Sequence, residues 1–308
     1  MANTDPSRNK TIEQQALTAG IAINLTMALA GWLAYYLSRS QALLLDGNFS
    51  FLMVVSLFVA MRISAIKEKR TALFPYGQFV YEALYSLLKG IMISGVLLVT
   101  FIQNTLAVLH YLGGGATHTL NTPVILVYSI AMVLLCFGSA IYYRLQNQKM
   151  QGVSTILRAE YSGAIVDGFM SAGIGVALVG IRYIDLQSSF GFLHYIGDSL
   201  LVLLLCVLLG KGPIVLIRDS FIELAGGTLQ DGQGRVRIEA VLNQHLHQPG
   251  LLTGSYISKT GSQYLVVAYL DVAIVEQIGS EGIREIRRQI VAELGRDYPN
   301  ILFETVLA

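Results

Sequence analysis

Six long apolar segments constrain this chain more than any other feature of its sequence. Each segment has about 20 residues or more, which is the length an α-helix needs to cross roughly 30 Å of hydrocarbon. Charged residues make up only 13% of the chain, and its mean hydropathy is +0.57. The segments therefore predict six transmembrane helices, at Ala16 to Leu37, Ala42 to Met61, Ala83 to Leu109, Pro123 to Tyr143, Ser162 to Ile181 and Ile196 to Ile217.

The loops between these segments differ in positive charge. Lysine and arginine gather after the second, fourth and sixth segments, at Lys67, Lys69, Arg70, Arg144, Lys149, Lys211 and Arg218. The positive-inside rule then predicts that both termini are cytoplasmic. A polar leader precedes the first segment, so a cleaved signal peptide is not expected. The simplest expectation is a multi-pass protein of a bacterial cytoplasmic membrane.

The chain changes character after residue 220, where it becomes mixed and soluble in composition. Helical and strand-like patterns alternate there in the order α-β-β-α-β, which predicts a small α+β domain of ferredoxin-like type. We therefore expect a transmembrane domain at residues 1–220 and a cytoplasmic domain at residues 221–308. The expected elements are a helix at Arg235 to Gln248, strands at Leu251 to Ile257 and Tyr264 to Ile274, a helix capped by Ser280 and a strand at Asn300 to Leu307.

Two aspartates inside the apolar segments share one local pattern. Asp46 and Asp167 are each followed by glycine and, four residues on, by a serine, Ser50 or Ser171. A carboxylate inside a membrane is costly and marks an ion pathway, and residues four apart share a helix face. We predict that these four side chains form a cation site. Oxygen ligands favour magnesium, manganese or calcium over zinc and copper, and a monovalent ion is the alternative.

Lys89 adds a positive charge inside the third segment. A buried ammonium seeks a carboxylate, so Lys89 could pair with Asp46 or Asp167 when no cation is bound and couple transport to protons. The alternative is that its long side chain reaches the membrane surface. Glu82, nearer the surface, is expected to anchor the loop or the helix end.

Several other function classes are not supported by the sequence. No nucleophile–base set, phosphate loop or Cys-x-x-Cys pattern is present, so we expect neither an enzyme nor a cofactor. The net charge of +1 gives no footprint for nucleic acid. Cys136 and Cys206 are expected to pack as small apolar residues. His245 and His247 lie two apart, on different helix faces, and are expected to be exposed to solvent.

Short motifs occur in order along the chain. They are Ser40-Gln-Ala-Leu-Leu-Leu-Asp46, Phe74-Pro-Tyr-Gly77 with Glu82, Arg158-Ala-Glu160, Asp198 at the head of the sixth segment, and the segment from Ile217 to Gly227. Their order and spacing resemble the cation diffusion facilitator, or cation efflux, family. The resemblance implies a homodimeric secondary transporter that exports a cation, expected to be a divalent metal, from the cytoplasm by proton antiport. Its partners would be the lipid bilayer, the cation and the proton.

The chain departs from the family at the metal site. The four family ligand positions fall on Phe49, Met53, Gly163 and Asp167, of which only Asp167 can bind a hard cation. In the soluble domain, the family's histidine positions fall near Tyr269 and Glu304, so a regulatory metal site there is not expected. Two alternatives therefore stay open, namely a transport-inactive structural or regulatory homologue and a monovalent cation/proton antiporter.

Overall fold

Six long helices form the first part of the chain in this computed structural model, which describes residues 6–114, 122–149, 155–181, 183–185, 187–298 and 300–308. Every one of these helices contains a stretch long and apolar enough to cross a membrane, as predicted. The protein is therefore a multi-pass membrane protein. The helices are α1 (Pro6–Ser38), α2 (Gln41–Ile66), α3 (Val80–Leu112), α4 (Thr122–Lys149), α5 (Thr155–Ile181) and α6 (Leu193–Leu224).

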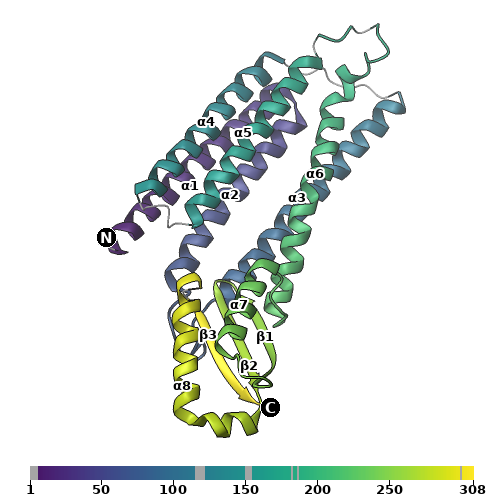
Figure 1. Cartoon of the computed structure of the whole chain (residues 1–308). Helices are drawn as coiled ribbons and strands as arrows, with labels where there is room; N and C mark the ends of the chain where they lie inside the picture. The colour runs from purple at the N-terminus through teal and green to yellow at the C-terminus, as the bar shows by residue number, and fades with distance from the viewer. Residues whose placement is uncertain (1–5, 115–121, 150–154, 182, 186, 299) are drawn as a thin grey trace. The chain divides into compact units, whose positions relative to one another are not determined.

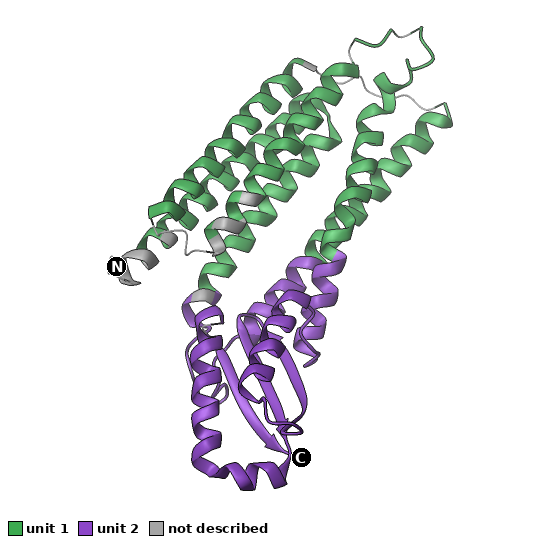
Figure 2. Cartoon of the chain, viewed as in Figure 1, with its two compact units in different colours: residues 1–62, 91–213 green, residues 63–90, 214–308 purple. Residues whose placement is uncertain are grey.

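The chain divides into two compact units, shown in Figure 2. The first unit contains residues 1–62 and 91–213, and the second contains residues 63–90 and 214–308. The link between α2 and α3 thus groups with the C-terminal part of the chain. The division predicted from sequence at residue 220 stays a prediction, because a grouping by contacts does not establish which part folds alone.

In the first unit, α1, α2, α4 and α5 lie together as a bundle (Figure 1). Its core includes Met27 from α1, Leu43 from α2, Met132 from α4 and Leu178 from α5, each of them buried. Other apolar side chains point outward, and the single chain leaves Leu33 60%, Leu134 69% and Val127 70% exposed. Such a surface fits a lipid bilayer, which solvates apolar side chains.

The second unit contains a three-stranded sheet in the order β1-β2-β3. β1 (Leu252–Thr260) and β2 (Gln263–Leu270) are antiparallel, and β3 (Ile301–Leu307) lies parallel to β2. Helices α7 (Gly232–His245) and α8 (Val272–Asp297) complete the predicted α-β-β-α-β order. Their buried residues share one core with the sheet, made of Ile238, Leu242, Val266, Ile290, Leu294 and Phe303 among others.

One of the predicted boundaries in this domain is wrong. The strand expected to reach Ile274 ends at Leu270, because the Asp271 carboxylate accepts a hydrogen bond from the Ile274 amide at 3.1 Å and caps α8. A break at Gly279, where φ is +77°, divides α8 into two helical segments. Ser280 lies at the start of the second segment, as predicted, whereas the first segment was not predicted. The residues just after Asp271 are rich in β-branched side chains, which are typical of strands. The prediction therefore extended the strand past the residue that caps the helix.

Glu82 anchors a loop of the second unit. Its carboxylate accepts from the Lys67 ammonium at 2.9 Å and from the Ser262 amide and hydroxyl at 2.6 and 2.7 Å. Ser262 lies in the β1–β2 turn, where Gly261 has a φ of +59°. These contacts fix the start of α3 to the hairpin and agree with the anchoring role expected for Glu82.

Candidate functional site

The start of α2 is held by a carboxylate from α6. The Ser40 hydroxyl donates to Asp198 at 2.8 Å, and the amides of Gln41 and Ala42 donate to it at 2.5 and 3.3 Å. The first amides of a helix have no partner within the helix, and a carboxylate is the acceptor that best complements their positive end. The buried Asp198 thereby sets the position of the first turn of α2, just before Asp46.

The glycine that follows each aspartate lies at a helix–helix contact. A Cβ on Gly31 of α1 would come within 2.6 Å of the Gly47 Cα in α2. A Cβ on Gly168 of α5 would come within 3.2 Å of the Phe137 ring in α4. Small residues let membrane helices approach this closely. The repeated Asp-Gly pattern therefore places each aspartate directly beside a tight helix contact.

A cavity of about 290 Å³ lies inside the first unit and is lined by residues of α1, α2, α4, α5 and α6. Asp46, Ser50 and Asp167 all line it. The four family ligand positions, Phe49, Met53, Gly163 and Asp167, line it as well. The structure thus brings together three of the four predicted ligands at the place where the family pattern locates its site.

Ser171, the fourth predicted ligand, does not line this cavity. It lies one turn beyond Asp167 on α5 and is only 3% exposed. Its hydroxyl forms no hydrogen bond that meets the geometric criteria within the described residues, but it lies beside the Cys136 thiol. A buried polar atom in that condition is costly, so a further ligand or a rearrangement would be needed to satisfy it.

Asp46 has a partner that the sequence did not reveal. The Tyr128 hydroxyl of α4 donates to its Oδ2 atom at 2.7 Å, and Tyr128 is 7% exposed. The two residues lie on separate helices, and no local motif links them. Asn48, close to Asp46 in sequence, instead accepts from Trp32 Nε1 at 3.0 Å and lies outside the cavity.

A second, smaller cavity of about 30 Å³ adjoins the first. The two share Met53, Gly163 and Asp167 among their lining residues, and the smaller one adds Glu160. Glu160 and Asp167 are seven residues apart on α5, about two turns, and so lie on one helix face. Together the two cavities connect Glu160 to Asp167 and then to Asp46. The seven-residue spacing was a sequence signal that could have identified Glu160.

Lys89 belongs to α3 in the second unit. Its ammonium lies 6.0 Å from the centroid of the Tyr85 ring, within the range of a cation–π contact. The pairing of Lys89 with Asp46 or Asp167 stays a prediction.

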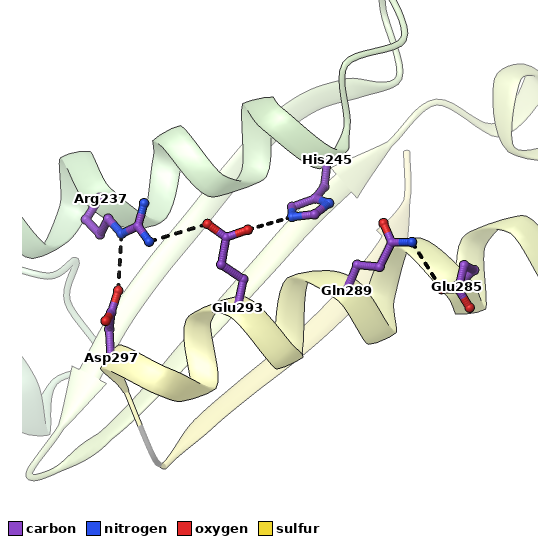
Figure 3. Close-up of polar contacts among 6 residues, drawn as sticks. All are labelled: Arg237, His245, Glu285, Gln289, Glu293 and Asp297. Atoms are coloured by element: carbon purple, nitrogen blue, oxygen red, sulfur yellow. Dashed lines mark hydrogen bonds and ion pairs between the residues drawn. The ribbon is translucent and has the colours of Figure 1, made fainter. Parts of the chain in front are cut away.

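The histidines of the C-terminal domain differ from each other. His247 is exposed as predicted, but the prediction was wrong for His245, whose side chain is only 17% exposed. The packing of α8 against α7 brings Glu293 within 2.9 Å of His245 Nε2 (Figure 3). That hydrogen bond, with the nearby Arg237, lowers the pKa of Glu293 below its usual value.

Among the residues that the structure describes, no group of three or more His, Cys, Asp or Glu side chains could hold a metal ion. Tyr269 and Glu304 lie on the adjacent strands β2 and β3, and Glu304 is ion-paired with Arg287 at 3.6 Å. A conventional cluster of hard or nitrogen ligands is thus missing from the described part of both units.

The family profile for the cation efflux transmembrane domain matches residues 17–225, which is more than half of the chain. No curated protein matches it. The match includes most of α1, all of α2 to α6 and both aspartates, so the chain belongs to the cation diffusion facilitator family of cation transporters.

Proposed function

We propose that this protein exports a cation from the cytoplasm in exchange for protons and binds the ion between Asp46 and Asp167. One observation carries the proposal: two carboxylates from different helices line a single cavity inside the membrane bundle. Carboxylates in that position are costly to bury and are retained where an ion passes. The cavity is large enough to admit an ion together with some of its water.

The two aspartates have different roles in this proposal. Asp167, which borders both cavities, is the first to meet the ion. Asp46 is oriented by the Tyr128 hydroxyl, and Ser50 adds a neutral oxygen on the next turn of α2. Ser171 joins them by a small shift of α5 that satisfies its buried hydroxyl.

Proton exchange follows from the charge of the two carboxylates. A pair of negative groups in a medium of low dielectric is stabilised either by a cation or by protons. Binding of the cation therefore releases protons, and their return displaces the cation. Continued alternation between these two states would move cations and protons in opposite directions.

The direction of transport and the membrane are inferred from charge. By the positive-inside rule, the positively charged loops favour a cytoplasmic location for both termini. In that orientation the Glu160 end of α5 faces the cytoplasm, and the smaller cavity serves as the entry path. The cation is expected to be a metal ion, and the protein is expected to act as a homodimer in a bacterial cytoplasmic membrane.

One observation favours a rival function. The described residues contain no three-membered group of conventional metal ligands, as expected for a structural or regulatory homologue that has lost transport. The Tyr128 bond to Asp46 counts against this rival, because a site without function has no need to orient its carboxylate.

Flux measurements decide between the two. The purified protein is reconstituted into liposomes with a set pH gradient, and uptake of Zn(II), Mn(II), Mg(II), Na(I) and Ag(I) is measured together with internal pH. Transport predicts uptake of at least one ion with opposite proton movement, which Asp167→Asn eliminates. If the folded protein moves none of these ions, the regulatory reading is correct.

A further inference from the structure

Sulfur atoms surround the proposed cation path. Four of the eight methionines of the chain line the larger cavity together with one cysteine. They are Met27 from α1, Met53 from α2, Met132 and Cys136 from α4, and Met170 from α5. Residues that are far apart in sequence thus converge on the space that contains both carboxylates.

The position of this sulfur cluster distinguishes it from ordinary packing. Methionine commonly fills irregular gaps in closed apolar cores. Here the sulfur side chains line a cavity that also contains Asp46 and Asp167. Met53 and Cys136 additionally line the smaller cavity that contains Glu160. Sulfur is therefore present along the whole connection from Glu160 to Asp46.

The small number of oxygen-bearing side chains in the larger cavity also favours a soft cation. Asp46, Ser50 and Asp167 are the oxygen-bearing side chains that line the larger cavity among the described residues. Magnesium and calcium prefer six or more oxygen ligands. Soft donors such as thioether and thiolate select soft ions, foremost Cu(I). Five sulfur-bearing side chains line the cavity, compared with three oxygen-bearing ones, so sulfur is the commoner donor type by residue.

We propose that this cavity is a site for a soft, thiophilic cation of the Cu(I) and Ag(I) type, bound by the sulfur atoms of Met53, Met170 and Cys136 and by the Asp167 carboxylate. The proposal rests on the proposed transport function for its physiological role and replaces the hard cation expected from Asp46 and Asp167 alone. The carboxylates provide the negative charge, and the sulfur atoms provide the selectivity. Met53 occupies a family ligand position but cannot bind a hard cation. In this proposal it is still a ligand, through its thioether sulfur.

Binding of Ag(I), which is stable to oxidation, tests the site directly. Full-length protein in detergent is titrated with Ag(I), and X-ray absorption identifies the atoms around the metal. Met53→Leu with Met170→Leu conserves volume and so preserves the fold, which size-exclusion chromatography verifies. The matched control is Met92→Leu, because Met92 lies on α3, is 46% exposed and does not line this cavity.

We expect sulfur neighbours around bound Ag(I) in the wild type. The double variant should lose at least about tenfold in affinity, as expected for disturbed metal coordination, while Met92→Leu remains at the wild-type value. An oxygen-only shell, or equal affinity in the double variant and the control, would overturn the soft-cation site. The same is true if Ag(I) does not bind.

Flux of the same variants separates this inference from the proposed function. Zn(II) or Mn(II) transport that is lost in Asp167→Asn but unchanged in the methionine double variant keeps the transporter and rejects the sulfur site. Sulfur-bound Ag(I) in a protein that moves no ion keeps the site and rejects transport. Ag(I) flux that is lost in both Asp167→Asn and the methionine double variant supports the transport function and the soft-cation site together.

Discussion

The acidic side chains of the two units have different kinds of partner. In the C-terminal domain, acidic residues face cationic ones, as where Arg237 contacts Glu293 at 3.3 Å and Asp297 at 3.2 Å (Figure 3). In the membrane unit, Asp46 receives its hydrogen bond from a neutral hydroxyl. Charge in the first case is neutralised within the protein, whereas charge in the second remains available to a ligand. The kind of partner, more than burial, thus separates a structural carboxylate from a functional one.

Asp198 sharpens this comparison within the membrane unit. It is buried like a functional carboxylate, yet it accepts three hydrogen bonds from the start of α2. Burial alone would have placed Asp198 in the ion path. Its donors identify it as a structural cap.

The largest effect is expected for Asp167→Asn. Removal of the charge that borders both cavities should abolish cation flux, because a neutral amide neither balances the charge of the cation nor exchanges protons. The protein should remain folded, as judged by size-exclusion chromatography and thermal melting. Asp198→Asn is the contrasting variant and should lower the melting temperature. If Asp167→Asn transports at the wild-type rate, Asp167 has no part in the mechanism.

A smaller effect is expected for Tyr128→Phe. The change removes the hydroxyl that donates to Asp46, and a hydrogen bond to a charged group contributes about 1.5–3 kcal/mol. Flux should therefore fall by about tenfold or more. Tyr142→Phe on the same helix serves as the control. Equal flux in the two variants would show that Asp46 does not depend on Tyr128 for its orientation.

Lys89 tests whether a countercharge takes part in the cycle. If the cation displaces its ammonium, Lys89→Met should bind the cation more tightly and turn over more slowly, because nothing competes for the carboxylates. Lys89→Arg keeps the charge on a bulkier head and should be intermediate. Affinity and turnover come from flux at graded cation concentration. Identical curves for all three proteins would make Lys89 a membrane anchor only.

The smallest effect concerns the ion pairs of the C-terminal domain. The hydrogen bond from His245 lowers the pKa of Glu293, so the stabilisation is present above the usual glutamate range, near pH 4.3, and is lost as pH falls below it. Glu293→Gln should flatten this acid dependence by a few degrees at most in melting temperature. Thermal melting of the full-length protein in detergent, followed by circular dichroism, measures it, with the exposed Glu276→Gln as control. An unchanged acid profile in Glu293→Gln would contradict this role.

Sequence alone predicted the features that depend on local signals. Segment length and charge gave the six membrane helices, and the Asp-Gly repeat identified Asp46 and Asp167. Tyr128 and the sulfur cluster could not be found in this way, because they reach the cavity through contacts between distant helices. Asp198 was recognised as a motif residue, but its role as the cap of α2 depends on the approach of α6.

The cap on α2 also has a mechanical consequence. A helix fastened at one end moves little near that end and much at the other. Asp46 lies roughly 8 Å from the fixed end along the helix axis, whereas Ile66 lies roughly 37 Å from it. A tilt of α2 about the Asp198 contact would therefore carry its far end several times farther than Asp46. An ion bound by Asp46 would therefore lie close to the pivot of such a tilt and would be displaced much less than the end of α2 at Ile66.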